Sequence, residues 1–397
     1  MEKIKFIEDN PDLGIAYDWS KIYKECKRLK IYPKDPAIWN PLTVPVWETK
    51  WNVLMSIRSK GKTTALLLLG LVMYRMYGTV TMYLGQNKDK IRPKNTSTMY
   101  GVITINNYIS KIFDGKYNDI ILKSGGKWYL VLRDEDGKVI DTDSKACCVM
   151  AAIPDYEDYK STFVYPTGDL IVFDEFISKN YYPNEFLDLT QMISNIIRNR
   201  LSPVIFMTAN TINKHYPYFN ELEIYDVVQS LQAGEHVITT GTKGTRVYTA
   251  IIDPTVNEKK KIFNRTFFGF ANPALGAITG ETTWSEFNYP HIIKDKDAET
   301  LLNCVYIYHN KKLVNLEIVL NNVGLSINVH WAKRTYDDSI IYTCDPIYDK
   351  RYRFKLGTNN NRLDKLINAL FKTNKVYYAT NDVGSFVESY LKYCKMI

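Results

Sequence analysis

The sequence predicts an α/β protein with a mostly parallel sheet flanked by helices, and three observations support this. Short apolar runs that end in polar residues recur at 51–55, 170–173 and 203–209, a pattern typical of buried parallel strands. The segment after the first run, 64–69, is apolar on all faces, as in a helix buried against a sheet. A second helix is predicted at 183–200, so that strands and helices alternate along the chain.

The length of 397 residues suits two or three domains. We predict an N-terminal α/β domain at 1–225 that includes a leader at 1–46. Residues 226–290, where periodicity weakens and Gly, Thr, Pro and a charge run gather, are assigned to a linker or connecting subdomain. The remaining residues, 291–397, are assigned to a separate C-terminal domain.

The chemistry of the chain is indicated first by the segment 56–63, which follows the first apolar run and ends in Gly61-Lys62-Thr63. A strand, a tight turn and a helix start would point backbone N–H groups at one place, where a phosphate chain can bind. We expect Lys62 to contact the β- and γ-phosphates and Thr63 to offer its hydroxyl to Mg²⁺. The usual pattern has Gly where this chain has Ser56, a residue that tolerates positive φ poorly.

The expected nucleotide-binding residues are therefore those of this loop and the helix start: Ser56, Arg58, Ser59, Lys60, Gly61, Lys62, Thr63 and Thr64. A GK[ST] triplet alone also occurs in ordinary surface turns. A second segment favours the phosphate-binding loop over a surface turn.

Asp174 and Glu175 end the apolar run that starts at Leu170. In a doubly wound sheet the carboxyl ends of the strands form the ligand crevice. Asp174 is predicted to hold Mg²⁺, and Glu175 to orient or deprotonate the attacking water. Two carboxylates at a strand end are also found in solvated turns, but both segments in this order favour a nucleoside triphosphate site.

Two further polar positions are candidates for catalysis. Asn210 ends the third apolar run and would lie beside Glu175, where it could sense the γ-phosphate; strand ends also often carry Asn for local reasons alone. The helix at 183–200 ends in Arg198-Asn199-Arg200. These arginines either complement the helix dipole or neutralise transition-state charge in the site of a neighbouring subunit.

Composition narrows the compartment and the partners. The six cysteines and five histidines are scattered without metal-ligand spacing, which favours reduced thiols in a cytosolic protein. No apolar run reaches transmembrane length and no signal-peptide core is present, so we expect no membrane partner. The net charge of +8 suits a polyanionic partner.

The last hundred residues predict strands at 314–320, 325–331, 339–343 and 376–379, with helices at 362–372 and from 385. This order resembles half of an RNase H-like domain. Nucleases of that fold need inward carboxylates that hold two metal ions. The first predicted hairpin offers Asn321 and Asn322 instead, so we predict a docking module without nuclease activity.

The segments 169–177, 182–185, 198–200, 208–210 and 216–219, taken together, resemble the DNA-packaging (encapsidation) ATPases of phi29-like podoviruses. The resemblance is strongest at 50–220. It implies an ASCE-type P-loop ATPase core and a degenerate RNase H-like C-terminal domain. It also implies a homomeric, pentameric ring that uses ATP and Mg²⁺ to move double-stranded DNA into a phage prohead at its portal vertex, in the host cell cytoplasm. Some members of the family also contact a structural prohead RNA.

By the same resemblance, Lys62 and Thr63 bind nucleotide and metal, Asp174 binds Mg²⁺, and Glu175 is the catalytic carboxylate. Arg198 corresponds to the trans-acting arginine finger, and Lys88 to a basic residue that acts across the subunit interface.

Two other functions remain open from the sequence. One is an AAA+ or RecA-like helicase or replication ATPase, which uses the same core. The other is a nucleic-acid-binding protein whose P-loop has decayed, as Ser56 suggests. A GTPase is disfavoured because the chain lacks an NKxD segment.

Overall fold

The computed structural model describes residues 14–35, 38–57, 60–155, 165–178, 181–210, 213–253, 255, 258–268, 289–292, 300–321, 324–336, 338–357 and 361–394. The chain divides into two compact units. The first comprises Met1–Ser178, Glu185–Ile212 and Glu221–Ser285, and the second Lys179–Asn184, Asn213–Asn220 and Glu286–Ile397. Two short segments that interrupt the first unit in sequence therefore belong to the second unit. No helix in the described part of the chain is long and apolar enough to cross a membrane.

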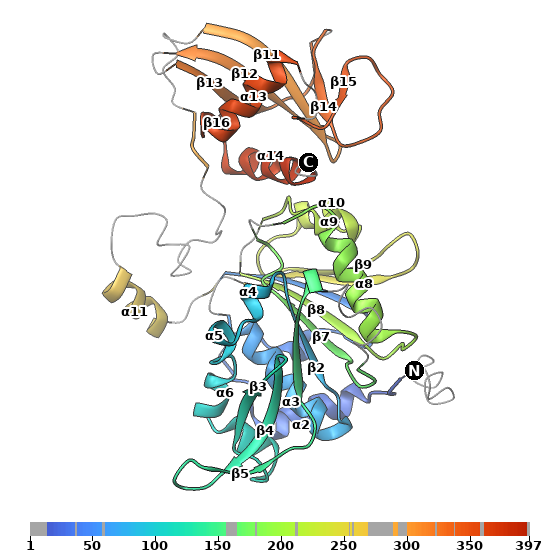
Figure 1. Cartoon of the computed structure of the whole chain (residues 1–397), viewed down its shortest axis with the longest axis vertical. Helices are drawn as coiled ribbons and strands as arrows, with labels where there is room; N and C mark the ends of the chain where they lie inside the picture. Colours follow the sequence, from blue (N-terminus) through green and yellow to red (C-terminus); the bar gives the residue numbers. More distant parts are fainter. Residues whose placement is uncertain are drawn as a thin grey trace. The chain divides into compact units, whose positions relative to one another are not determined.

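The first unit is built on a ten-stranded sheet (Figure 1). Its parallel centre contains, in spatial order, β6 (Cys148–Ala152), β2 (Thr81–Gly85), β7 (Leu170–Asp174), β8 (Val204–Ala209), β1 (Trp51–Met55) and β10 (Arg246–Ile251). Most residues of these strands are buried, as the apolar runs predict. Strand β8 separates β1 from β7, the strand order that the predicted ASCE core requires.

Antiparallel strands extend both edges of this sheet. β9 (His236–Thr240) pairs with β10 at one edge, and β4 (Lys127–Arg133) pairs with β6 at the other. β4 in turn carries β3 (Asp119–Lys123) and β5 (Val139–Thr142). Strands β3, β4 and β5 therefore form antiparallel hairpins beside β6.

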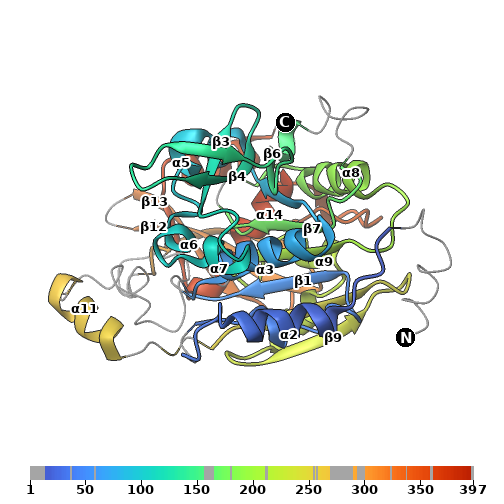
Figure 2. The ribbon, with the colours of Figure 1, turned by 90° about the horizontal axis from the view of Figure 1, so that it is seen from below.

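The long helix α3 (Lys62–Tyr77) covers one face of the sheet, together with α2 (Trp19–Leu29), α6 (Gly101–Ile105) and α7 (Tyr108–Ile112). Helix α8 (Glu185–Ile197) lies on the other side of β7 from α3 (Figure 2). It begins and ends inside the predicted range 183–200. Short helices complete the connections: η2 (Pro41–Thr43), α4 (Lys88–Ile91), α5 (Pro93–Thr96), η3 (Ile153–Asp155), α9 (Tyr218–Glu221), α10 (Tyr225–Ser230) and α11 (Glu258–Phe268).

The described part of the leader, from residue 14, contributes to this core. The side chain of Asp18 caps α2 by accepting a hydrogen bond from the backbone N–H of Lys21 at 3.0 Å. The apolar side of α2 is buried against α3, with Trp19, Ile22 and Leu29 all under one tenth exposed. Burial of one helix face thus fixes residues 19–29 of the leader.

The assignment of 226–290 to a linker is wrong for its first part. Strands β9 and β10 belong to the large sheet, and β10 pairs in parallel with the P-loop strand β1. Val247, Ala250 and Ile251 of β10 are buried, which explains why this segment joins the sheet. The Gly- and Thr-rich turns around these short strands conceal their apolar pattern. Residues 269–288 lie outside the described part of the chain.

The second unit contains a six-stranded sheet with the order β15-β14-β11-β12-β13-β16. β11, β12 and β13 are antiparallel, while β14, β15 and β16 run parallel to their partners. This is the arrangement expected of an RNase H-like domain. The elements are β11 (Thr300–His309), β12 (Lys312–Asn321), β13 (Gly324–Trp331), β14 (Ile341–Thr343), β15 (Tyr352–Phe354), α13 (Arg362–Lys372), β16 (Val376–Tyr378) and α14 (Asn381–Cys394).

Two of these strands, β11 and β15, were not predicted, and β11 rather than β12 is the first strand of the domain. Neither β11 nor β14 contains an Asp or Glu. The absence of nuclease activity in this domain stays a prediction.

Aromatic side chains hold the two short excursions within the second unit. Tyr181, from the segment after β7, stacks edge-on against Tyr216, from the segment after β8, with ring centroids 5.7 Å apart. The ammonium of Lys392 on α14 lies 4.5 Å from the Tyr216 ring. Nε2 of buried His215 lies 2.8 Å from Oδ1 of Asp382, also on α14. The segments that follow β7 and β8 are therefore packed against α14.

A buried ionic network fixes the amino-terminal edge of the large sheet. Asp169, just before β7, is fully buried and forms an ion pair of 2.9 Å with Arg200. Its other oxygen accepts hydrogen bonds from Tyr17 at 3.0 Å and Ser202 at 2.5 Å. Arg198, two residues before Arg200, is exposed.

Replacing Arg200 by methionine should lower the free energy of unfolding by about 3–5 kcal/mol, because it leaves the Asp169 carboxylate buried without its charge partner. Arg198→Met, the matched control at an exposed site, should change it by less than about 0.5 kcal/mol. Urea unfolding followed by circular dichroism measures both values. Equal effects of the two substitutions would contradict the structural role of Arg200.

Candidate nucleotide-binding site

The candidate site lies at the carboxyl edge of β1, β7 and β8, where the P-loop, the acidic pair and Asn210 meet. Gly61 starts α3 with φ at 72°, in the left-handed region that favours glycine. A Cβ there would also lie 3.2 Å from Cγ2 of Ile38. This glycine is therefore required both for the turn and for close packing.

Ser56, the departure from the usual P-loop pattern, is compatible with the loop. It is fully buried, and it is not among the described residues with positive φ. Its hydroxyl donates to the Ile57 carbonyl at 2.7 Å and accepts a hydrogen bond from the ammonium of Lys62. The serine thus supports the site lysine in a conformation that does not need glycine.

Lys62 lies inside the site and is buried. Its Nζ donates to Oδ1 of Asn210 at 3.0 Å as well as to Ser56. Burial lowers the pKa of Lys62 to about 8, although the nearby charges of Asp174 and Glu175 oppose this shift. The ammonium is therefore poorly solvated and well placed to gain from a phosphate ligand.

Asp174 is held by hydroxyl groups from three elements. Its Oδ2 accepts from Thr63 on α3 at 2.6 Å and from Tyr83 on β2 at 3.1 Å. Its Oδ1 accepts from Thr208 on β8, and from the backbone N–H of Glu175 at 2.9 Å. Thr63 and Asp174 together offer the hard oxygen ligands that Mg²⁺ prefers, so the residues fit the metal that the sequence implies.

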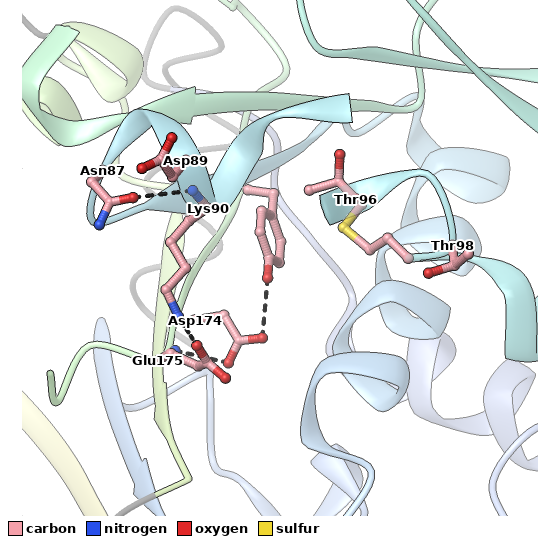
Figure 3. Close-up of a pocket in the computed structure, with 9 residues that line it drawn as sticks. Asn87, Asp89, Lys90, Thr96, Thr98, Asp174 and Glu175 are labelled. Atoms are coloured by element: carbon pink, nitrogen blue, oxygen red, sulfur yellow. Dashed lines mark hydrogen bonds and ion pairs between the residues drawn. The ribbon is translucent and has the colours of Figure 1, made fainter. Parts of the chain in front are cut away.

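Glu175 follows the strand in a left-handed conformation, with φ at 53°. Its Oε1 accepts a hydrogen bond from Nδ2 of Asn210 at 3.3 Å. The ammonium of Lys90 forms an ion pair with Oε2 (Figure 3). Strained backbone of this kind costs about 1–3 kcal/mol and is concentrated at functional sites.

The structure therefore brings together Ser56, Gly61, Lys62, Thr63, Asp174, Glu175 and Asn210. Thr64 occupies the first turn of α3, and the Lys60 side chain turns away to the carbonyl of Thr255. Burial lowers the pKa of Lys60. Arg58 and Ser59 lie outside the described residues.

Two predicted site residues lie elsewhere. Nζ of Lys88 forms an ion pair with Oδ1 of Asp155 at 2.5 Å, and in the described chain it is Lys90 that contacts Glu175. Arg198 follows α8, close in sequence to the Arg200–Asp169 pair at the opposite edge of the sheet. A role for Lys88 or Arg198 in a neighbouring subunit stays a prediction.

Sequence reasoning missed Tyr83, Thr208 and Lys90. Tyr83 and Thr208 lie on the strands that flank β7, and Thr208 pairs directly with Asp174 in the sheet. The only signal that the sequence gives for Tyr83 and Thr208 is a polar group near the carboxyl end of an otherwise apolar strand.

No family model matches the chain. It is similar to the "DNA packaging protein" of Bacillus phage PZA and to that of Bacillus phage phi29, each 24% identical over 187 residues. That match covers 46% of this chain and 48% of each relative. The chain thus spans about half the length of the curated relatives it matches.

Among solved structures, the chain is similar to one from the bacteriophage phi29 viral genome packaging motor assembly. The TM-score is 0.51 at 18% identity, over 90% of this chain and 100% of that chain. At this identity the likeness establishes the fold. The resemblance that the motifs indicated is therefore confirmed: the chain is similar in sequence to the packaging proteins of phi29-like phages and shares the fold of the phi29 packaging motor protein.

Proposed function

We propose that this chain is an ATPase that drives the packaging of double-stranded phage DNA into a preformed prohead. The observation that carries the proposal is the convergence of Lys62 and Thr63, at the start of α3, on Asp174 and Asn210 at the ends of β7 and β8. These are the groups that bind a triphosphate and its metal. The similarity to DNA packaging proteins supports the choice of substrate.

Each side chain of the site would have a different role in ATP hydrolysis. Lys62 would neutralise charge on the β- and γ-phosphates, and Thr63 with Asp174 would hold Mg²⁺, which offsets the charge that develops on the phosphate oxygens. Glu175 would accept a proton from the attacking water. Asn210 contacts both Lys62 and Glu175, so its position would report the state of the γ-phosphate to the base.

The position of Arg198 supports action in a neighbouring subunit. Arg200, two residues further along the chain, binds Asp169 at the start of β7, whereas Glu175 follows the end of that strand. A strand of this length spans about 17 Å, so Arg198 and Glu175 of one chain lie at opposite edges of the sheet. We propose a homomeric, pentameric ring in which Arg198 of one subunit completes the site of the next.

The remaining partners follow from this proposal. The net charge of +8 suits a DNA backbone. The second unit, an RNase H-like fold without acids on β11 and β14, would dock the ring on the portal vertex of the prohead, where a structural RNA is a further candidate partner. The protein would work in the host cell cytoplasm and bind the prohead transiently.

Purified protein should hydrolyse ATP in the presence of Mg²⁺, faster with double-stranded DNA and more than linearly with protein concentration. Glu175→Gln should reduce turnover by at least about 100-fold while ATP still binds, because it removes the proton acceptor. A phosphate-release assay measures turnover, and equilibrium dialysis measures ATP binding. Absence of both binding and hydrolysis would instead favour the protein with a decayed P-loop, and unwinding of a forked duplex would favour the helicase.

Arg198→Ala should leave ATP binding within about twofold of wild type and reduce turnover by about 10³-fold or more. Mixing it with Glu175→Gln protein should restore activity, because a subunit with intact Glu175 then meets a neighbour with intact Arg198. Full turnover by Arg198→Ala alone, or no recovery on mixing, would refute action in trans.

Mg-ATP binding should take up protons between pH 8 and 9. The pKa of Lys62 is about 8 without ligand, so in this pH range the Lys62 side chain is neutral in a large fraction of the molecules. Phosphate favours the charged form and raises that pKa, so affinity should fall by up to about tenfold per pH unit above 8. Calorimetry in two buffers of different ionisation enthalpy measures the uptake. Lys62→Arg, whose guanidinium stays charged, should bind without it.

A further inference from the structure

Two cysteines of the second unit, Cys344 and Cys394, lie side by side although they are far apart in the sequence. Cys344 directly follows β14, and Cys394 is the last residue of α14. Their thiols are hydrogen-bonded to each other, and both cysteines are free and half-buried. Both also pack against the apolar core of this unit. The fold thus brings together two thiols that the sequence shows only as scattered.

The contact between the two thiols is supported by hydrogen bonds between the segments that carry them. The backbone N–H of Lys355 donates to the carbonyl of Thr343, at the end of β14, at 2.8 Å. The next residue, Leu356, donates its backbone N–H to the hydroxyl of Tyr390 at 2.8 Å. Tyr390 is fully buried and lies one helical turn before Cys394 on α14. The segment that starts at Lys355 therefore bridges the ends of β14 and α14.

The surroundings of Cys394 favour its thiolate form. A hydrogen bond from the Cys344 thiol is the largest cause that lowers the pKa of Cys394, and the Tyr390 hydroxyl adds a second bond. The backbone N–H of Leu356 and the nearby ammonium of Lys355 act in the same direction, and together these contacts outweigh the effect of burial. Because the thiolate is the reactive form of cysteine, Cys394 is the nucleophile of the pair.

Cys344 stays protonated while Cys394 is ionised. Its hydrogen bond to Cys394, and after that its burial, raises the pKa of Cys344 well above the usual range. Oxidation of Cys394 removes the largest of these causes, and the charge of Lys355 then favours ionisation of Cys344. The two thiols therefore ionise one after the other, which is the order that an attacking thiol and a resolving thiol need.

We propose that Cys344 and Cys394 form a thiol oxidation site whose substrate is hydrogen peroxide and whose product is a disulfide between the ends of β14 and α14. First the sulfur of Cys394 attacks the peroxide: an S–O bond forms, the O–O bond breaks, and the released hydroxide takes up a proton and leaves as water. The sulfur of Cys344 then attacks the sulfenic acid, so that an S–S bond replaces the S–O bond and a second water leaves. The peroxide is the two-electron oxidant, and both thiol protons end in water.

The disulfide would join α14 covalently to β14. Asp382 and Lys392 on α14 hold His215 and Tyr216, which belong to the segment after β8. Oxidation would therefore fix α14 against the sheet of the second unit and restrain that segment with it. A cross-link of this kind stabilises a fold chiefly by restricting the unfolded chain.

The test treats reduced full-length protein with hydrogen peroxide at neutral pH, blocks the remaining thiols with iodoacetamide and identifies the products by mass spectrometry. A disulfide between Cys344 and Cys394 is the expected product. Cys394 should react at least about tenfold faster than Cys304, a half-buried thiol bonded to Tyr306 and Asn315. Burial raises the pKa of Cys304, so less of it is thiolate.

Substitutions separate the roles of the two thiols. In Cys344→Ser the sulfenic acid on Cys394 has no resolving thiol, so dimedone should capture it. In Cys394→Ser, peroxide should oxidise Cys344 at least about tenfold more slowly than it oxidises Cys394 in wild type, because burial still raises the pKa of Cys344. Cys304→Ser is the matched control and should form the disulfide at the wild-type rate.

Calorimetry measures the effect of the cross-link. Oxidation should raise the Tm by about 5 °C or more in wild type and Cys304→Ser, reversibly with dithiothreitol, and should not raise it in Cys344→Ser or Cys394→Ser. The inference is overturned if this disulfide does not form, if Cys304 is oxidised as fast as Cys394, or if the Tm stays unchanged on oxidation. No step of the test contains nucleotide, so its result is independent of the proposed ATPase function.

Discussion

The carboxylate of Asp174 is the point on which the geometry of the site depends. It accepts hydrogen bonds from Thr63 on α3, Tyr83 on β2 and Thr208 on β8. A partly buried carboxylate needs such partners because desolvation is otherwise costly. Since Lys62 precedes Thr63 and Glu175 follows Asp174, the same bonds set the distance between the Lys62 ammonium and the Glu175 carboxylate. The two motifs, far apart in the sequence, act as one site because of this shared anchor.

The parts of the fold that the sequence predicts are those with a continuous apolar pattern. The buried strands β1, β7 and β8 and helix α3 lie where the apolar runs indicate, and α13 has the predicted bounds 362–372. Strands β9 and β10 were missed because they are short and surrounded by Gly and Thr, so burial in the sheet rather than local preference determines them. In β11 the alternation of buried residues such as Val305 and Ile307 with polar residues and tyrosines is confined to the end of the strand. The apolar pattern is therefore too short to predict this strand.

The residues of the site were easier to predict than their contacts. Their charge and ligand preference single out Lys62, Thr63, Asp174 and Glu175 as candidates, and the structure brings these residues together. The ion pair between Lys90 and Glu175 depends on how a single helical turn packs on β2, which no local pattern contains. In the same way, Ser56 suggests a decayed loop from the sequence, whereas the structure shows its hydroxyl supporting Lys62.

The two excursions into the second unit have a consequence for the order of folding. His215 and Tyr216 find their partners, Asp382 and Lys392, on α14, the last helix of the chain. Synthesis proceeds from the amino terminus, and domains generally fold as they emerge. The segment that follows Asn210 therefore cannot complete its packing until α14 has been made. The contacts of His215 and Tyr216 thus wait for a helix far along the sequence, and a nascent chain that stops before α14 remains without them.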